Sequence, residues 1–184
     1  MGFGLLERFD CREWLQWIEQ TQGGELPVYL AGVSMGAATV LMAAGLDLPR
    51  CVRGIVADCA FTSPEAIWRH VARRNLRLSY DLRSPAIDRI CRKKLRMGAG
   101  EYSTVEALKE SELPVLFIHG TRDHFVPVEM TYENYCACRG PKRLFVVPGA
   151  DHGMSYLVDR PGYEAAMAEF WAFCEAETPP QGGA

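Results

Sequence analysis

The chain lacks the features that would assign it to several specialised classes. No apolar run approaches the roughly 20 residues of a membrane-spanning helix, and no signal peptide precedes the first predicted helix. The net charge of −3 argues against a dedicated nucleic-acid binder. The seven cysteines form no C-x-x-C pair, and the spacing of Cys136 and Cys138 does not match the usual zinc sites. We therefore expect a cytoplasmic protein with reduced thiols, without a bound metal, a nucleic-acid partner or a membrane partner.

What is present is enough apolar sequence for one core. The 184 residues are 48% hydrophobic, which suits a single domain. Predicted helices and short apolar strands alternate, in the order helix 4–21, strand 27–31, helix 35–45, strand 52–58, strand 114–119, helix 127–138, strand 143–148 and helix 162–175. This alternation predicts an α/β fold with a mostly parallel sheet and flanking helices. We expect one domain over residues 1–178 and a disordered tail over 179–184.

A serine stands at the centre of the clearest motif. Ser34 lies in Gly32-Val33-Ser34-Met35-Gly36, between an apolar run and a helix-forming run. Strand, sharp turn and helix in this order predict a nucleophile elbow, where the flanking glycines avoid collisions and the hydroxyl projects above the sheet edge. The backbone N–H of Met35, at the start of the helix, is the predicted oxyanion donor. The alternative is an ordinary serine in a tight turn.

A nucleophilic serine needs a base, and the base needs an orienting acid. Among the four histidines, His152 lies in a glycine-bracketed loop after a predicted strand, from which it can swing over the sheet edge. His119 falls inside a predicted strand, where a hydrogen-bonded structural role fits better. Asp123 follows that strand, on the side where ligands bind in open α/β sheets. These positions predict a triad of Ser34, His152 and Asp123, with Asp58 as the alternative acid.

Four ordered motifs carry a resemblance to a known family. They are GVSMGAA over 32–38, ADCAFTS over 57–63, FIHGTRDHFVP over 117–127 and GADHGMSY over 149–156. With them the chain resembles the C-terminal two-thirds of an α/β-hydrolase, and is closest to bacterial serine esterases and acyl hydrolases that include cinnamoyl-ester hydrolase-like proteins. The resemblance implies the order Ser, Asp, His along the chain and no cofactor. Asp151 departs from the pattern, since such proteins often carry a small residue before the catalytic histidine.

The resemblance also implies that the start of the fold is incomplete. About 26 residues precede the first predicted strand, and they form one amphipathic helix. Its apolar residues recur at helical spacing: Leu5, Leu6, Phe9, Trp14, Trp17 and Ile18. This fold normally supplies several earlier strands, and a loop between them gives the second oxyanion donor. We therefore expect an unpaired sheet edge, and self-association as a homo-oligomer or dependence on a partner.

The stretch 61–112 is too long for an unstructured connection, and it lies where this fold commonly inserts a cap. We expect an irregular segment with helical patches that forms a small helical cap. Between Arg69 and Arg96 it carries ten Lys or Arg and two acids. That charge fits a solvated helical face, an attraction for anionic substrates or, least well, a nucleic-acid contact. The candidate substrate-binding residues are Phe61, Trp68, Phe125 and Met154.

These predictions favour a serine hydrolase that cleaves carboxylic esters through an acyl-enzyme. Ser34 attacks the acyl carbonyl, His152 takes and returns the proton, and Asp123 orients the imidazole. We expect small soluble esters, aromatic ones among them, ahead of long-chain lipids, because no exposed apolar lid is evident in the sequence. The alternatives are a serine peptidase or thioesterase of the same fold, or a non-catalytic module.

Overall fold

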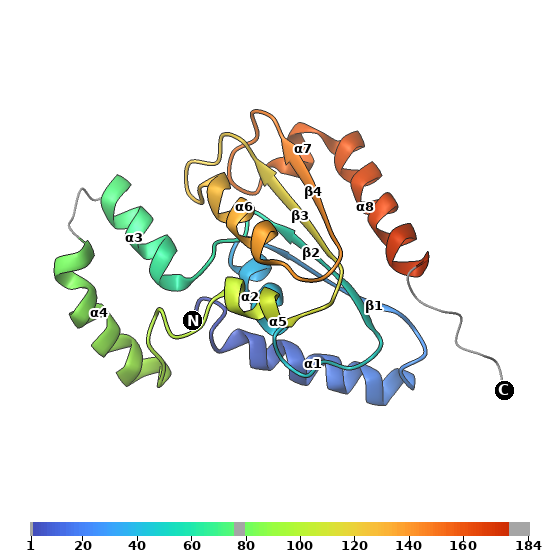
Figure 1. Cartoon of the computed structure of the whole chain (residues 1–184), viewed down its shortest axis with the longest axis horizontal. Helices are drawn as coiled ribbons and strands as arrows, with labels where there is room; N and C mark the ends of the chain where they lie inside the picture. Colours follow the sequence, from blue (N-terminus) through green and yellow to red (C-terminus); the bar gives the residue numbers. More distant parts are fainter. Residues whose placement is uncertain (1, 76–79, 177–184) are drawn as a thin grey trace.

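Four strands form one parallel sheet in the computed structural model, which describes residues 2–75 and 80–176. The strand order is β1-β2-β3-β4, and every neighbouring pair is parallel (Figure 1). The bounds are β1 (Val28–Val33), β2 (Val52–Asp58), β3 (Val115–Gly120) and β4 (Lys142–Val147). All four predicted strands are present within two residues of their predicted bounds, which confirms the mostly parallel sheet. The predicted tail, 179–184, lies outside the described residues.

Helices cover both faces of this sheet (Figure 1). On one side lie α1 (Glu7–Gln22), α2 (Met35–Ala43), α5 (Thr104–Glu110) and α6 (Val128–Ala137). The short α7 (Ser155–Val158) leads into α8 (Arg160–Ala176), which packs on the opposite face against β2 and β4. Among the described residues, no helix combines the length and the apolar content that crossing a membrane requires.

The central strands are apolar on both faces because helices bury both sides of the sheet. In β3, Phe117 belongs to the same buried cluster as Leu41 of α2. Its neighbour Leu116 points the other way and packs in a cluster with Phe170 of α8. Successive side chains of a strand alternate between the faces, so one strand serves two cores. This packing fixes the strand ends and therefore the loops that follow them.

Two further helices stand off the sheet as a hairpin, α3 (Pro64–Asn75) and α4 (Tyr80–Leu95) (Figure 1). The stretch 61–112 is therefore largely helical, where the sequence suggested irregular structure with helical patches. It also divides into two parts, because α5 does not join the hairpin and packs instead against α2 and α6. The hairpin is the part of this stretch that occupies the place expected for a cap.

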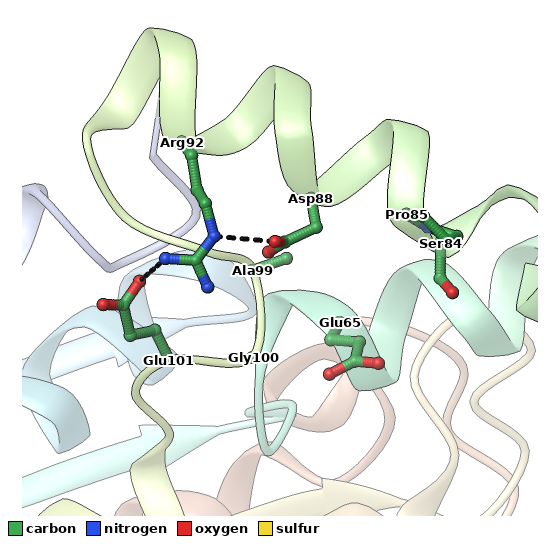
Figure 2. Close-up of a pocket in the computed structure, with 8 residues that line it drawn as sticks. All are labelled: Glu65, Ser84, Pro85, Asp88, Arg92, Ala99, Gly100 and Glu101. Atoms are coloured by element: carbon green, nitrogen blue, oxygen red, sulfur yellow. Dashed lines mark hydrogen bonds and ion pairs between the residues drawn. The ribbon is translucent and has the colours of Figure 1, made fainter.

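Ion pairs lie at the base of the hairpin, two of them within one helix and one, between Arg92 and Glu101, joining α4 to the segment that follows it. Figure 2 shows Arg92 of α4 between Asp88 and Glu101, with Glu65 of α3 on the other side of a polar cavity of about 440 Å³. Arg92 bonds Asp88 at 2.7 Å and Glu101 at 3.1 Å, and Glu65 bonds Arg69 at 2.8 Å. Such exposed pairs each contribute only about 0–1 kcal/mol. They do show that part of the basic charge of this stretch is already matched by carboxylates.

The first helix and the first strand leave unpartnered surfaces. Leu5 and Leu15 are buried, but Trp14 and Trp17 are 64% and 55% exposed and contact each other edge to face. In the described sheet β1 is an edge strand, so one side of it has no neighbouring strand. Edge strands offer unpaired N–H and C=O groups to other chains. We therefore expect the 184-residue chain to self-associate, which light scattering over a concentration series measures. A monomer at every concentration would contradict this expectation.

Candidate active site

Ser34 sits at a strained turn between β1 and α2. Its backbone has φ 55° and ψ −115°, a combination that side-chain-bearing residues rarely adopt. Hydrogen bonds hold the turn from both sides: the Ser34 N–H donates to the Asp58 carbonyl at 2.8 Å, and the Ser34 carbonyl accepts from the Ala38 N–H at 3.0 Å. The strand β2 and the helix α2 thus enforce the strain. This is the local geometry of a nucleophile elbow.

The two glycines of the motif have different roles. A Cβ added at Gly32 would lie 2.3 Å from the carbonyl carbon of Gly36 and 2.5 Å from the Ala37 nitrogen. A Cβ added at Gly36 would meet no neighbouring atom within 4 Å. The expectation that both glycines relieve a collision is therefore wrong for Gly36. Only Gly32 lets the start of α2 approach β1 closely enough to form the turn.

Matched substitutions test this difference. Gly32→Ala forces a methyl group into backbone atoms, and we expect it to lower the free energy of unfolding by about 1–3 kcal/mol or more. Gly36→Ala places the same methyl in open space on a helix, where alanine is favoured over glycine by up to about 1 kcal/mol. Thermal unfolding of both variants measures the contrast. Equal midpoints for Gly32→Ala and the wild type would show that the turn is not built as described.

Three side chains form a continuous hydrogen-bonded chain at the carboxyl edge of the sheet. The Ser34 hydroxyl lies 2.8 Å from Nε2 of His152, and Nδ1 of His152 lies 2.7 Å from Oδ2 of Asp123. An ionised carboxylate only accepts hydrogen bonds, so Nδ1 of His152 carries the proton and donates it to Asp123. In the neutral ring Nε2 is then an acceptor facing the serine O–H. That tautomer is the one a general base needs.

Asp123 is held by more groups than the histidine it faces. Its Oδ1 accepts the backbone N–H groups of Phe125 and Val126, each at 2.8 Å, and its Oδ2 also lies 3.1 Å from Nε2 of His119. Burial alone would raise the pKa of this carboxyl. The hydrogen bonds from His119, His152 and the two backbone N–H groups outweigh burial and hold the pKa of Asp123 well below its ordinary value. The carboxylate is therefore ionised at neutral pH.

His119 has a hydrogen-bond partner that the sequence did not indicate. It is fully buried in β3, and its Nε2 lies near the Val126 carbonyl at 3.0 Å as well as near Asp123. Both of these oxygens only accept, so Nε2 carries the proton and Nδ1 accepts from the Thr131 hydroxyl of α6 at 2.7 Å. The hydrogen-bonded role expected for His119 is present, but its partner is the acid itself. The only available signal was its place four residues before Asp123.

Asp58, the alternative acid, faces other partners. Its Oδ1 accepts from the Ser155 hydroxyl at 3.2 Å, and it also interacts with the Tyr163 hydroxyl. Burial raises the pKa of Asp58 above its ordinary value, although these hydrogen bonds act in the opposite direction. The carboxylate hydrogen-bonded to His152 is that of Asp123. The geometry thus favours Asp123 over Asp58 as the orienting acid.

A second carboxylate links the loops that carry the acid and the histidine. Asp151 Oδ1 accepts the backbone N–H of His152 at 2.7 Å and that of His124 at 3.0 Å. Its Oδ2 lies 3.1 Å from Nδ1 of His124. The N–H of His124, then that of His152, lowers the pKa of Asp151. The unusual residue before His152 therefore braces the two loops and does not compete with Asp123 for the imidazole.

One group of potential metal ligands overlaps this site. Ligand atoms of Cys59, Asp123 and His152 lie within 4.8 Å of one another. Asp123 and His152 are already engaged with each other. Burial, followed by the nearby Asp58, raises the pKa of the Cys59 thiol to about 12. The thiol is therefore protonated at neutral pH, whereas a metal takes the thiolate, so these residues fit a metal site poorly.

The remaining predicted site residues fall in different environments. Phe61 is 2% exposed and belongs to a buried cluster, so it does not face an open site. Trp68 lines a pocket beside the hairpin, and Phe125 lines the same pocket with its ring centroid 5.1 Å from that of His152. Met154 is exposed and follows the histidine loop. Met35 is the first residue of α2, where a backbone N–H has no acceptor within its helix.

Comparisons with known proteins assign the chain to a family. The family model described as alpha/beta hydrolase family matches residues 1–168. The uncharacterized protein YqkD of Bacillus subtilis is 31% identical over 171 residues, 92% of this chain and 55% of its own length. The uncharacterized protein YfhR of Escherichia coli O157:H7 is 27% identical over 77% of this chain and 44% of its own length. The chain thus spans about half the length of the curated relatives it matches.

Solved structures agree on the fold. An esterase of Pyrococcus furiosus is similar with a TM-score of 0.66 and 19% identity, over 94% of this chain and 64% of that one. Acetyl xylan esterase 1 of a Thermoanaerobacterium species has a TM-score of 0.66 and 19% identity, over 93% of this chain and 52% of that one. At such identities the likeness shows the fold alone. Together with the family model, it means that the chain belongs to the alpha/beta hydrolase family.

Proposed function

We propose that this protein is a serine hydrolase that cleaves carboxylic esters. The observation that carries the proposal is the unbroken hydrogen-bonded chain from Ser34 through His152 to Asp123. Each position supports the role that we propose for it: Ser34 lies at a strained elbow, His152 lies in a loop, and four hydrogen bonds keep the Asp123 carboxylate ionised. Two of the proteins similar in fold are esterases, which supports the choice of an ester bond.

In the proposed reaction Ser34 Oγ attacks the ester carbonyl while Nε2 of His152 takes the serine proton. The backbone N–H of Met35 stabilises the oxyanion of the tetrahedral intermediate. When this intermediate collapses, the ester C–O bond breaks and His152 gives its proton to the leaving alcohol, which leaves an acyl-serine. Water then attacks the acyl-serine with His152 as base again, and the acid product departs with Ser34 restored. Asp123 stabilises the imidazolium in both halves.

Matched substrates test the proposed reaction class. We would compare the rates on an ester, a thioester and an anilide that share one acyl group, with the serine nucleophile intact. The proposal predicts that the ester is cleaved with the highest kcat/KM. A thioester or an anilide cleaved ahead of the ester would replace the proposal by a thioesterase or a peptidase of the same fold. Cleavage of none of the three by folded protein would indicate a non-catalytic module.

A further inference from the structure

An apolar pocket of about 590 Å³ lies between the two helices of the hairpin and extends to Phe3 and to Phe125 in the loop after Asp123. Its walls come from α3, α4 and the loop that follows Asp123, through Ile67, Trp68, Val71, Ile87, Ile90 and Phe125 among others. Among the described residues that line it, none is charged. Pockets of roughly 300–1,000 Å³ hold drug-sized ligands, so this one is far larger than an acetyl group requires.

One direct ring contact and one shared buried cluster connect this pocket to the proposed triad. Phe125 forms part of the pocket wall, and its ring packs against the ring of His152 with a centroid distance of 5.1 Å. Met35, which follows the nucleophile, packs against the buried cluster that contains the pocket residue Ile67, and Trp68 packs against the same cluster. The pocket therefore reaches the proposed base through Phe125.

The charge of the hairpin lies away from this pocket. Arg69, His70, Arg73 and Arg74 line a separate hollow on α3, and Arg92 lines the polar cavity at the hairpin base. The hairpin is thus amphipathic, with its apolar side toward the proposed triad and its basic side elsewhere. Attraction of an anionic group to the reacting carbonyl finds no support in this arrangement. The sequence could not show which side of the hairpin is apolar toward the pocket and which is basic, because the direction of each face depends on how the hairpin packs.

We propose that this pocket binds the apolar group of the ester, so that the enzyme prefers esters with a medium-chain or aromatic apolar group over acetyl esters. The inference rests on the proposed function, and it replaces the expectation that the best substrates are small. The apolar lid that was not evident in the sequence is supplied by the inner face of the α3–α4 hairpin. The same pocket chemistry suits an apolar acyl chain or an apolar alcohol, and the test separates the two.

The test measures kcat/KM along two series of esters. One series lengthens the acyl chain of p-nitrophenyl esters from butyrate to octanoate and adds a cinnamate, and the other lengthens the alcohol of acetate esters from ethyl to octyl. Each buried methylene contributes about 0.8 kcal/mol, which is about fourfold in kcat/KM. We expect a rise of tenfold or more along the series whose chain enters the pocket. A flat or falling kcat/KM in both series, with butyrate still cleaved, overturns the inference and leaves the proposed function standing.

Substitutions of a pocket residue and of a non-pocket residue on α4 locate the effect. Ile90 lines the pocket and is 56% exposed, so Ile90→Glu puts a charge at the pocket without burying it deeply. Arg89 is exposed, does not line the pocket and lies away from Ile87 and Cys91 on the helix, so Arg89→Glu is the matched control. The readout is the ratio of kcat/KM for the eight-carbon ester to kcat/KM for the short-chain ester, in the series that responds to chain length. We expect Ile90→Glu to reduce this ratio at least fivefold and Arg89→Glu to leave it unchanged. Labelling of Ser34 by a fluorophosphonate in both variants verifies a folded site. An unchanged ratio in an Ile90→Glu variant that is still labelled overturns the inference. If the wild-type protein is neither labelled nor able to cleave esters, the proposed function is overturned together with the inference.

Discussion

Replacement of Ser34 by alanine is expected to abolish ester hydrolysis almost completely. The nucleophile has no substitute at the elbow, and loss of a single serine or histidine from such a triad costs about 10⁶-fold in kcat. His152→Ala should be as severe, because an unactivated serine hydroxyl is a poor nucleophile at neutral pH. The double variant should lose no more than either single variant, since the residues act as one unit. Rates on one chromogenic ester measure all three.

A serine outside the site provides the control for this prediction. Ser103 caps α5 by accepting the Glu106 N–H, so Ser103→Ala should cost about 1 kcal/mol of stability and leave the ester rate unchanged. Circular dichroism and thermal unfolding establish that each variant is folded. A folded Ser34→Ala that retains more than about a tenth of the wild-type rate would contradict the proposed nucleophile.

The second large effect is expected for Asp123→Asn, at about 10⁴-fold in kcat. The asparagine oxygen must accept the N–H groups of Phe125 and Val126, which turns its NH₂ toward His119 and His152. Donor then faces donor at Nδ1 of His152, so the ring shifts its proton to Nε2. A protonated Nε2 cannot take the serine proton. The loss therefore comes from the wrong tautomer, with the geometry of the site largely kept.

Two other carboxylates serve as comparisons for Asp123. Asp151→Asn loosens the link between the two loops but leaves Asp123 hydrogen-bonded to His152, so we expect kcat to fall less than about tenfold. Asp58→Asn removes a buried carboxyl whose hydrogen-bond partners are Ser155 and Tyr163, so it should affect stability more than rate. Steady-state kinetics and thermal unfolding separate these outcomes. Near-native activity in Asp123→Ala would transfer the orienting role to Asp58.

The arrangement of Ser34, Asp123 and His152 was predictable for a topological reason. Each follows an apolar strand, and the carboxyl ends of parallel strands meet at one edge of the sheet. The parallel direction of the strands follows from short apolar runs that alternate with helices, and this alternation is a local feature of the chain. The topology alone therefore predicts that a serine, an acid and a histidine in the loops at that edge lie close together.

Other features depended on packing that the pattern does not contain. Phe61 and Trp68 look alike as candidate pocket residues, yet the first is buried in a core cluster and the second lines the pocket. Gly32 and Gly36 stand symmetrically about the serine, yet only Gly32 faces another backbone. The link from His119 to Asp123 arises because the loop after β3 folds back on its own strand. Each of these distinctions is set by which side of an element faces its neighbour.

The most direct test of the proposed mechanism is the site of covalent modification by a fluorophosphonate, determined by mass spectrometry of proteolytic peptides. We expect one adduct per chain, located on Ser34, and its near-complete loss in a folded His152→Ala variant, because only the activated serine attacks phosphorus at a useful rate. Folded wild-type protein without an adduct, or with the adduct on another serine, would contradict the proposed mechanism.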